Sequence, residues 1–115
     1  MEASPKELIT YETTDGKRPF DKWLYALKDK ATIARIVSRL ERVADGNFGD
    51  VKPVGDGVSE LRLKFGSGYR VYFAQEGDKF ILLICGGDKS SQDKDIQPAK
   101  TYWVDYRRRS HGKNK

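Results

Sequence analysis

The fold of this chain is decided by one stretch, residues 60–92, which reads ELRLKFGSGYRVYFAQEGDKFILLICGGDKSSQ. Three strand-like runs in it are separated by turn signals at residues 66–68 and 76–78. Apolar and polar residues alternate in the first two runs, so the stretch predicts a three-stranded antiparallel meander. The third run, residues 80–85, is continuously apolar, which predicts a strand that is buried on both faces.

Cations gather on one face of the first two strands. Side chains alternate between the two faces of a strand, so four residues share the face opposite the apolar set: Arg62, Lys64, Arg70 and Tyr72. Three neighbouring cations repel one another, and such a face suits a polyanion or the charge that develops on a reacting phosphate. A solvated outer face, common in antiparallel sheets, explains the same pattern.

A further cation follows a glycine pair at the end of the third strand, in the block Gly86-Gly87-Asp88-Lys89. Glycine lets the backbone turn sharply and approach a ligand closely. Loops at strand ends often carry functional residues. Lys89 therefore joins the candidate site.

Length and composition limit the class of protein. The 115 residues suit one domain with a real core, which we place at residues 1–106. A single cysteine, Cys85, and a single histidine, His111, make a protein metal site unexpected, and we expect no cofactor. The longest apolar run has six residues. We therefore expect no membrane association, no signal peptide and a cytoplasmic location.

Most of the net charge of +5 lies at the C-terminal end of the chain. Residues 105–115 hold five basic residues and one acidic residue. We expect residues 107–115 to form a flexible tail, which either only solubilises the protein or clamps a nucleic acid through Arg107, Arg108 and Arg109.

The rest of the chain supplies one strand and three helices. Residues 7–13 are rich in β-branched and aromatic residues, as strands are. Pro19 is well placed in the first turn of a helix. Asp29 is a plausible cap for a second helix, which Gly46 closes. Residues 47–57 are expected to be a loop, and a final helix runs from residue 90 or 91 to about residue 108.

The second helix carries a row of arginines, Arg35, Arg39 and Arg42, mainly off its apolar stripe. This row is either a solvated helix face or a surface that touches a nucleic-acid backbone or an acidic partner.

These elements predict an α+β fold. The first strand completes its hydrogen bonds only by joining the meander, which gives a small antiparallel sheet, mixed at one edge, of about four strands. Two N-terminal helices pack on one face and a C-terminal helix follows. The twist of the sheet is expected to leave the cationic face concave.

This order of elements, with ELRLKFGSGYRVYF and LLICGGDKSSQDKDI, resembles the RelE/ParE superfamily of bacterial toxins. Within it the chain resembles the HigB-type addiction module killer protein branch, also called phage Gp49-like. The resemblance covers about residues 5–106. Its most specific parts are the blocks 60–62, 68–70 and 86–89 with Gln92, behind a Phe-x-x-Trp-Leu helix.

The resemblance implies the toxin of a type II toxin–antitoxin system, an mRNA interferase that inhibits translation. Such a ribosome-dependent endoribonuclease uses no metal: the mRNA 2′-hydroxyl attacks the neighbouring phosphate. Carried over by motif, the catalytic residues are Arg62, Lys64, Arg70 and Lys89. Among them Arg70 is expected to grip two phosphate oxygens, so that Arg70→Ala abolishes toxicity with the fold intact.

The resemblance also implies partners: a helix-turn-helix antitoxin, the ribosome with its mRNA, and operator DNA only through the antitoxin complex. We expect Tyr72 and the residues Arg107, Arg108 and Arg109 to bind nucleic acid. Family nucleases often place a tyrosine or histidine beyond the glycine block as general acid or base. Residues 90–95 contain neither, which leaves Tyr72, Asp95 or Lys64 for proton transfer.

Two other functions remain open. ParE-type relatives lack nuclease residues and poison DNA gyrase, and a non-catalytic protein would only pair with an antitoxin and operator DNA. The four catalytic candidates are dispensable for both alternatives.

Overall fold

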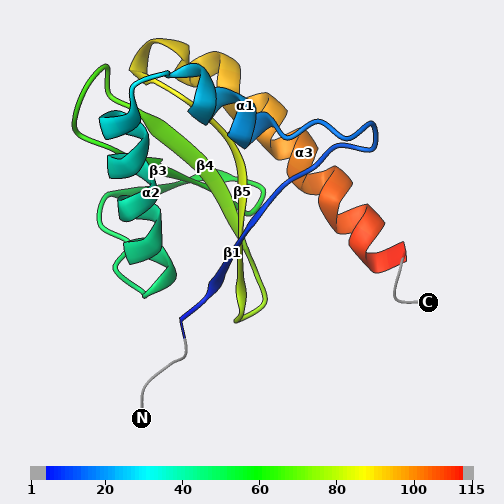
Figure 1. Ribbon diagram of the computed structural model, residues 1–115. Coiled ribbons are helices and arrows are strands. Elements are labelled where there is room, and N and C mark those ends of the chain that lie inside the picture. The colour runs from blue at the N-terminus through cyan, green and yellow to red at the C-terminus, as the bar shows by residue number, and fades with distance from the viewer. Residues whose placement is uncertain (1–4, 113–115) are drawn as a thin grey trace.

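The computed structural model describes the backbone of residues 5–112 and the side chains of residues 5–110. Figure 1 shows the helices and strands, which follow one another as β1 (Glu7–Thr10), α1 (Pro19–Ala26), α2 (Lys30–Ala44), β2 (Val51–Gly55), β3 (Val58–Arg62), β4 (Arg70–Glu76), β5 (Phe80–Gly87), the 3₁₀ turn η1 (Lys89–Ser91) and α3 (Gln92–Gly112). The α+β fold class is confirmed. No helix within the described residues is long and apolar enough to cross a membrane.

The sheet within the described residues has five strands in the order β1-β5-β4-β3-β2. The predicted meander is confirmed as β3–β4–β5, and β1 completes the sheet by pairing in parallel with β5. The prediction of about four strands missed β2, which lies in the expected loop 47–57. Pro53 and Gly55 are unfavourable in most strands, so the sequence of β2 resembles a loop. Both residues are tolerated because β2 is an edge strand, with a register shift between Pro53 and Gly55.

The starts and ends of the first two helices follow the sequence signals. Pro19 is the first residue of α1. The Asp29 carboxylate accepts hydrogen bonds from the Ala31 amide (3.2 Å) and the Thr32 hydroxyl (2.8 Å) at the start of α2. Gly46 follows α2 with φ +98°, a left-handed conformation that glycine adopts without strain. These three predictions are confirmed.

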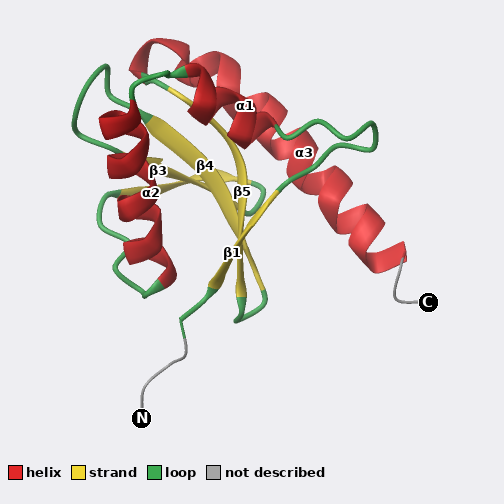
Figure 2. Cartoon of the chain, in the orientation of Figure 1, coloured by secondary structure: helices red, strands yellow, loops and turns green. Residues whose placement is uncertain are grey.

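Helices cover both faces of the sheet, as Figure 2 shows. On one face α1 and α2 bury the apolar residues of the strands, among them Leu61, Val71 and Phe73. On the other face α3 docks through Ala99 and Trp103 over Tyr72 and Ile84. The expectation of an uncovered concave face is therefore wrong over β4 and β5, because α3 occupies it.

The C-terminal helix is longer than expected. We placed the end of the folded domain at residue 106, whereas α3 continues through Gly112. Residues 113–115 of the predicted flexible tail lie outside the described residues. Arg107, Arg108 and Arg109 thus stand on the last turns of a helix that packs on the sheet.

Candidate functional site

A buried carboxylate joins β3, β4 and α3. The side chain of Glu60 is fully buried, and its two oxygens accept four hydrogen bonds. The donors are Arg62 Nε (3.0 Å), Arg70 Nη1 (3.0 Å), the Tyr72 hydroxyl (3.1 Å) and Gln92 Nε2 (2.8 Å). We call these five residues the Glu60 cluster. The cluster therefore ties the cationic strands to the first residue of α3.

The cluster sets the charge state of its members. Burial pushes the pKa of the Glu60 carboxyl upward, but the hydrogen bonds from its donors and the charge of Arg70 outweigh burial and hold this pKa below its ordinary value. Burial, and then the negative charge of Glu60, raises the pKa of the Tyr72 phenol. Tyr72 therefore stays protonated at neutral pH, which makes it a poor general base.

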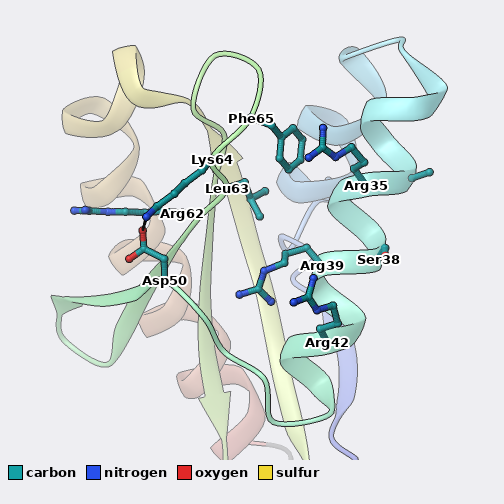
Figure 3. A pocket seen from close by; sticks show the side chains of 10 residues that line it. Arg35, Ser38, Arg39, Arg42, Asp50, Arg62, Leu63, Lys64 and Phe65 are labelled. Atoms are coloured by element: carbon teal, nitrogen blue, oxygen red, sulfur yellow. Dashed lines mark ion pairs between the residues drawn. The ribbon is translucent and has the colours of Figure 1, made fainter.

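A second concentration of cations lines an open groove between α2 and strand β3 with its following loop. The groove has a volume of about 580 Å³, and we call it the basic groove (Figure 3). Its lining residues are Ala34, Arg35, Ser38, Arg39, Arg42, Asp50, Arg62, Leu63, Lys64 and Phe65. Five cations and one carboxylate thus line the groove, and four of these cations remain when Arg62, which already donates to Glu60, is set aside.

The arginines of α2 line the groove because they share one side of that helix. Positions 35, 39 and 42 are one and two turns apart, so their side chains project in similar directions. Figure 3 shows Arg39 and Arg42 projecting from α2 toward the segment that carries Leu63, just after β3. Arg39 is anchored there, since its guanidinium donates to the carbonyl oxygens of Asn47 (3.0 Å) and Phe48 (2.5 Å).

The four catalytic candidates fall into three positions. Arg62 and Arg70 meet at Glu60, which confirms the strand parity that places them with Tyr72 on one face. Lys64 is 81% exposed at the groove, where its ammonium lies 3.6 Å from Asp50. Lys89 is exposed and does not line the groove; it lies beside the 63–69 loop, where a Cβ added to Gly68 would lie 3.2 Å from the Lys89 Cβ.

Exposure separates the candidates further. The Arg62 side chain is 34% exposed and the Arg70 side chain only 11%. We expected Arg70 to reach a phosphate, whereas its Nη1 is directed at a buried carboxylate. The catalytic role of these four residues stays a prediction.

The glycine pair of β5 makes room for the protein's own side chains. A Cβ at Gly86 would collide with the indole of Trp23, and a Cβ at Gly87 would collide with the carboxylate of Asp95. Asp95 accepts a 2.5 Å hydrogen bond from the Ser91 hydroxyl, and burial raises the pKa of its carboxyl. Burial also raises the pKa of the Cys85 thiol to about 12. Cys85 is therefore no nucleophile at neutral pH.

The arginines at the end of α3 lie across the sheet from α2. Arg109 pairs with Asp105 (2.9 Å), and its guanidinium lies 5.6 Å from the centroid of the Tyr11 ring. Arg107 lies 5.6 Å from the centroid of the Trp103 ring, and Arg108 is exposed. This surface is separate from the basic groove, so the two are rival sites for a nucleic acid.

Arg35, Arg39 and Arg42 were not predicted to be site residues. Their spacing was the available signal, and it left open whether the row faces water or a ligand. What makes them part of a groove is the position of residues 47–50 and of strand β3 opposite α2. Spacing along one helix carries no information on that opposite wall.

A five-stranded mixed sheet with two early helices and a C-terminal helix is broadly consistent with the fold of the addiction-module toxin (RelE/HigB-like) superfamily. The chain belongs to one family of that superfamily: residues 22–105 match the family described as "Phage derived protein Gp49-like (DUF891)". A Haemophilus influenzae protein, described only as uncharacterized, is 52% identical over 81 residues, which cover 70% of this chain and 82% of that protein.

Proposed function

We propose that this protein is the toxin of a type II toxin–antitoxin system, an endoribonuclease that cuts mRNA on the ribosome and so inhibits translation. The observation that carries the proposal is the basic groove, an open groove with five cations and one carboxylate. Such a surface attracts a phosphate backbone. Membership of an addiction-module toxin superfamily supports the toxin class.

The proposed reaction needs no group from outside the protein and its substrate. The 2′-oxygen of one nucleotide bonds to the adjacent phosphorus, and the bond from phosphorus to the 5′-oxygen breaks. The proton of the 2′-hydroxyl passes to a base, and the leaving 5′-oxygen takes up a proton. The products are a cyclic 2′,3′-phosphate and a free 5′-hydroxyl, and cations near the phosphate stabilise the transition state.

Accessibility assigns different roles to the candidate cations. Lys64 and the partly exposed Arg62 line the groove, so we assign them to the phosphate. Lys89, exposed beside the 63–69 loop and outside the groove, is the third accessible cation among the candidates. Arg70 acts as a positioning residue, because it holds the carboxylate that also binds Arg62. Among the proton-transfer candidates, Lys64 alone lines the groove, whereas Asp95, whose pKa burial raises, lines a different pocket beside Cys85 and Gly86.

The same charge distribution suggests how the toxin is held inactive. A helix-turn-helix antitoxin that lays an acidic segment in the basic groove would neutralise its cations and block RNA. Operator DNA would then be bound through the antitoxin.

Mapping of mRNA 5′ ends after induced expression tests the proposal. We expect codon-phased cuts from the wild-type protein and at least about tenfold fewer from Lys64→Gln, since one preorganised donor typically contributes that much or more. Lys52→Gln is the control, because Lys52 is exposed on the edge strand β2 and does not line the groove. Intact mRNA with a DNA supercoiling defect would overturn the proposal in favour of a gyrase inhibitor.

A further inference from the structure

One end of the basic groove carries an aromatic ring under a guanidinium. The Arg35 guanidinium carbon lies 3.9 Å from the centroid of the Phe65 ring, which is van der Waals contact with the ring face. Phe65 is held in turn, because it packs against the core and meets Tyr69 edge-on at 5.7 Å. The ring is thus a fixed support for Arg35.

A guanidinium on a ring still has a second face. Arg35 is exposed, and both Arg35 and Phe65 line the groove, so this second face is accessible to a ligand. Arginine planes stack on unpaired bases in RNA-binding proteins. The support from Phe65 restricts the rotamers of Arg35, so less conformational entropy is lost when a base stacks on it.

The groove continues from this end along α2. Arg42 stands two helical turns from Arg35, and Lys64 stands on the opposite wall. The residues of α2 between the two arginines include the small Ser38, which leaves space above the helix. A strand whose base stacks at Arg35 can therefore bring its phosphates to Arg42 and Lys64.

We propose that Arg35, held on Phe65, is a stacking platform for an unpaired base, so that the basic groove selects single-stranded RNA. This inference rests on the proposed function, since it names how the same groove recognises its substrate. A duplex keeps its bases stacked and paired and offers none to the platform. An acidic peptide would place its carboxylates at the N–H edge of the Arg35 guanidinium and would not need the free face of its plane.

Charge-conserving substitutions test the platform. Binding of the full chain to a labelled eight-nucleotide single-stranded RNA is measured by fluorescence anisotropy at one fixed salt concentration. An abasic ribose–phosphate oligomer of equal length and an RNA hairpin are the comparison probes, and gel electrophoresis checks that the RNA stays intact. Arg35→Lys keeps the charge and removes the planar group. Arg42→Lys is the matched control, because no aromatic ring contact supports Arg42 in the structure of residues 5–112.

We expect the wild-type protein to bind the RNA more tightly than either the abasic oligomer or the hairpin. Arg35→Lys should weaken RNA binding by about tenfold, the scale of one stacked base, and leave binding of the abasic oligomer unchanged. Phe65→Leu should act in the same direction, with thermal unfolding as the check on its fold. Arg42→Lys should leave the ratio of the two affinities unchanged.

Equal binding of the RNA and the abasic oligomer by the wild-type protein overturns the platform, as does an Arg35→Lys protein with wild-type RNA affinity. Tighter binding of an acidic peptide than of RNA also overturns it. These outcomes are separate from failure of the proposed function. If the protein cuts mRNA but binds RNA and the abasic oligomer equally, only the stacking platform is refuted. If it prefers RNA with bases but leaves mRNA intact, only the proposed nuclease activity is refuted.

Discussion

The Glu60 cluster and the basic groove both hold arginines, but they use them differently. In the cluster, Arg62 and Arg70 converge on one buried carboxylate, and four donors satisfy its two oxygens. Besides Arg62, the open groove is lined by a single carboxylate, Asp50, and by four cations that do not contact Glu60: Arg35, Arg39, Arg42 and Lys64. The presence of arginines is therefore not enough to identify a binding surface. An arginine whose charge is matched inside the protein stabilises the fold, and an excess of unmatched charge at a groove attracts a ligand.

The largest expected effect is on the free energy of unfolding, which should fall for a substitution in the Glu60 cluster and not for one in the basic groove. Arg70→Ala leaves Glu60 buried with less compensation, so we expect it to lower the free energy of unfolding by about 3–5 kcal/mol. Arg42→Ala in the groove removes an exposed side chain and should change it by less than about 0.5 kcal/mol. Urea unfolding of both variants measures the difference, and equal stability would mean that the Glu60 cluster contributes nothing to folding.

A smaller loss of stability is expected when the contact between α3 and the Glu60 cluster is removed. Gln92 donates a 2.8 Å hydrogen bond to Glu60, and a hydrogen bond to a charged group contributes about 1.5–3 kcal/mol. Gln92→Ala should therefore destabilise the protein by about that amount. Gln97→Ala is the matched control on the same helix, because Gln97 is exposed and should be nearly neutral. A Gln92 variant as stable as the Gln97 variant would show that this link is weak.

The smallest expected effect is on how the stability of the protein changes at low pH. The folded-state pKa of Glu60 lies below its unfolded value, so its contribution to stability is present above the unfolded pKa of about 4.3 and is lost as pH falls through the folded pKa. Glu60→Gln removes this contribution, and its stability should fall less steeply below about pH 4.3 than that of the wild-type protein. Urea midpoints at pH 7 and pH 3.5 measure the two slopes. Parallel slopes would contradict the lowered pKa of Glu60.

The elements of the fold followed from local signals in the sequence. Alternation predicted the meander, Pro19 and Asp29 predicted the starts of α1 and α2, and the apolar run 80–85 predicted the buried strand β5. Strand parity also placed Arg62, Arg70 and Tyr72 on one face. All of these depend on residues that are close together along the chain.

What the sequence did not reveal depends on contacts between distant residues. Glu60 and Gln92 are 32 positions apart, and only the docking of α3 makes them neighbours. Because it was not predicted that α3 docks over the face that carries Arg70, this residue was expected to be accessible and its loss to spare the fold. The structure instead predicts that Arg70→Ala destabilises the protein. The basic groove was missed for the same reason, since its two walls come from α2 and from β3 with the following loop.

We expect the basic groove, and not the arginine-rich end of α3, to bind RNA. The most direct measurement compares two double variants with equal loss of charge, Arg35→Gln with Arg42→Gln and Arg107→Gln with Arg108→Gln, by their affinity for single-stranded RNA over a range of salt. We predict that the groove variant binds RNA more weakly and that its salt slope falls by about 0.7 for each backbone phosphate that it no longer neutralises, with the α3 variant nearly unchanged. Weaker RNA binding by the α3 variant, together with wild-type binding by the groove variant, would contradict the claim.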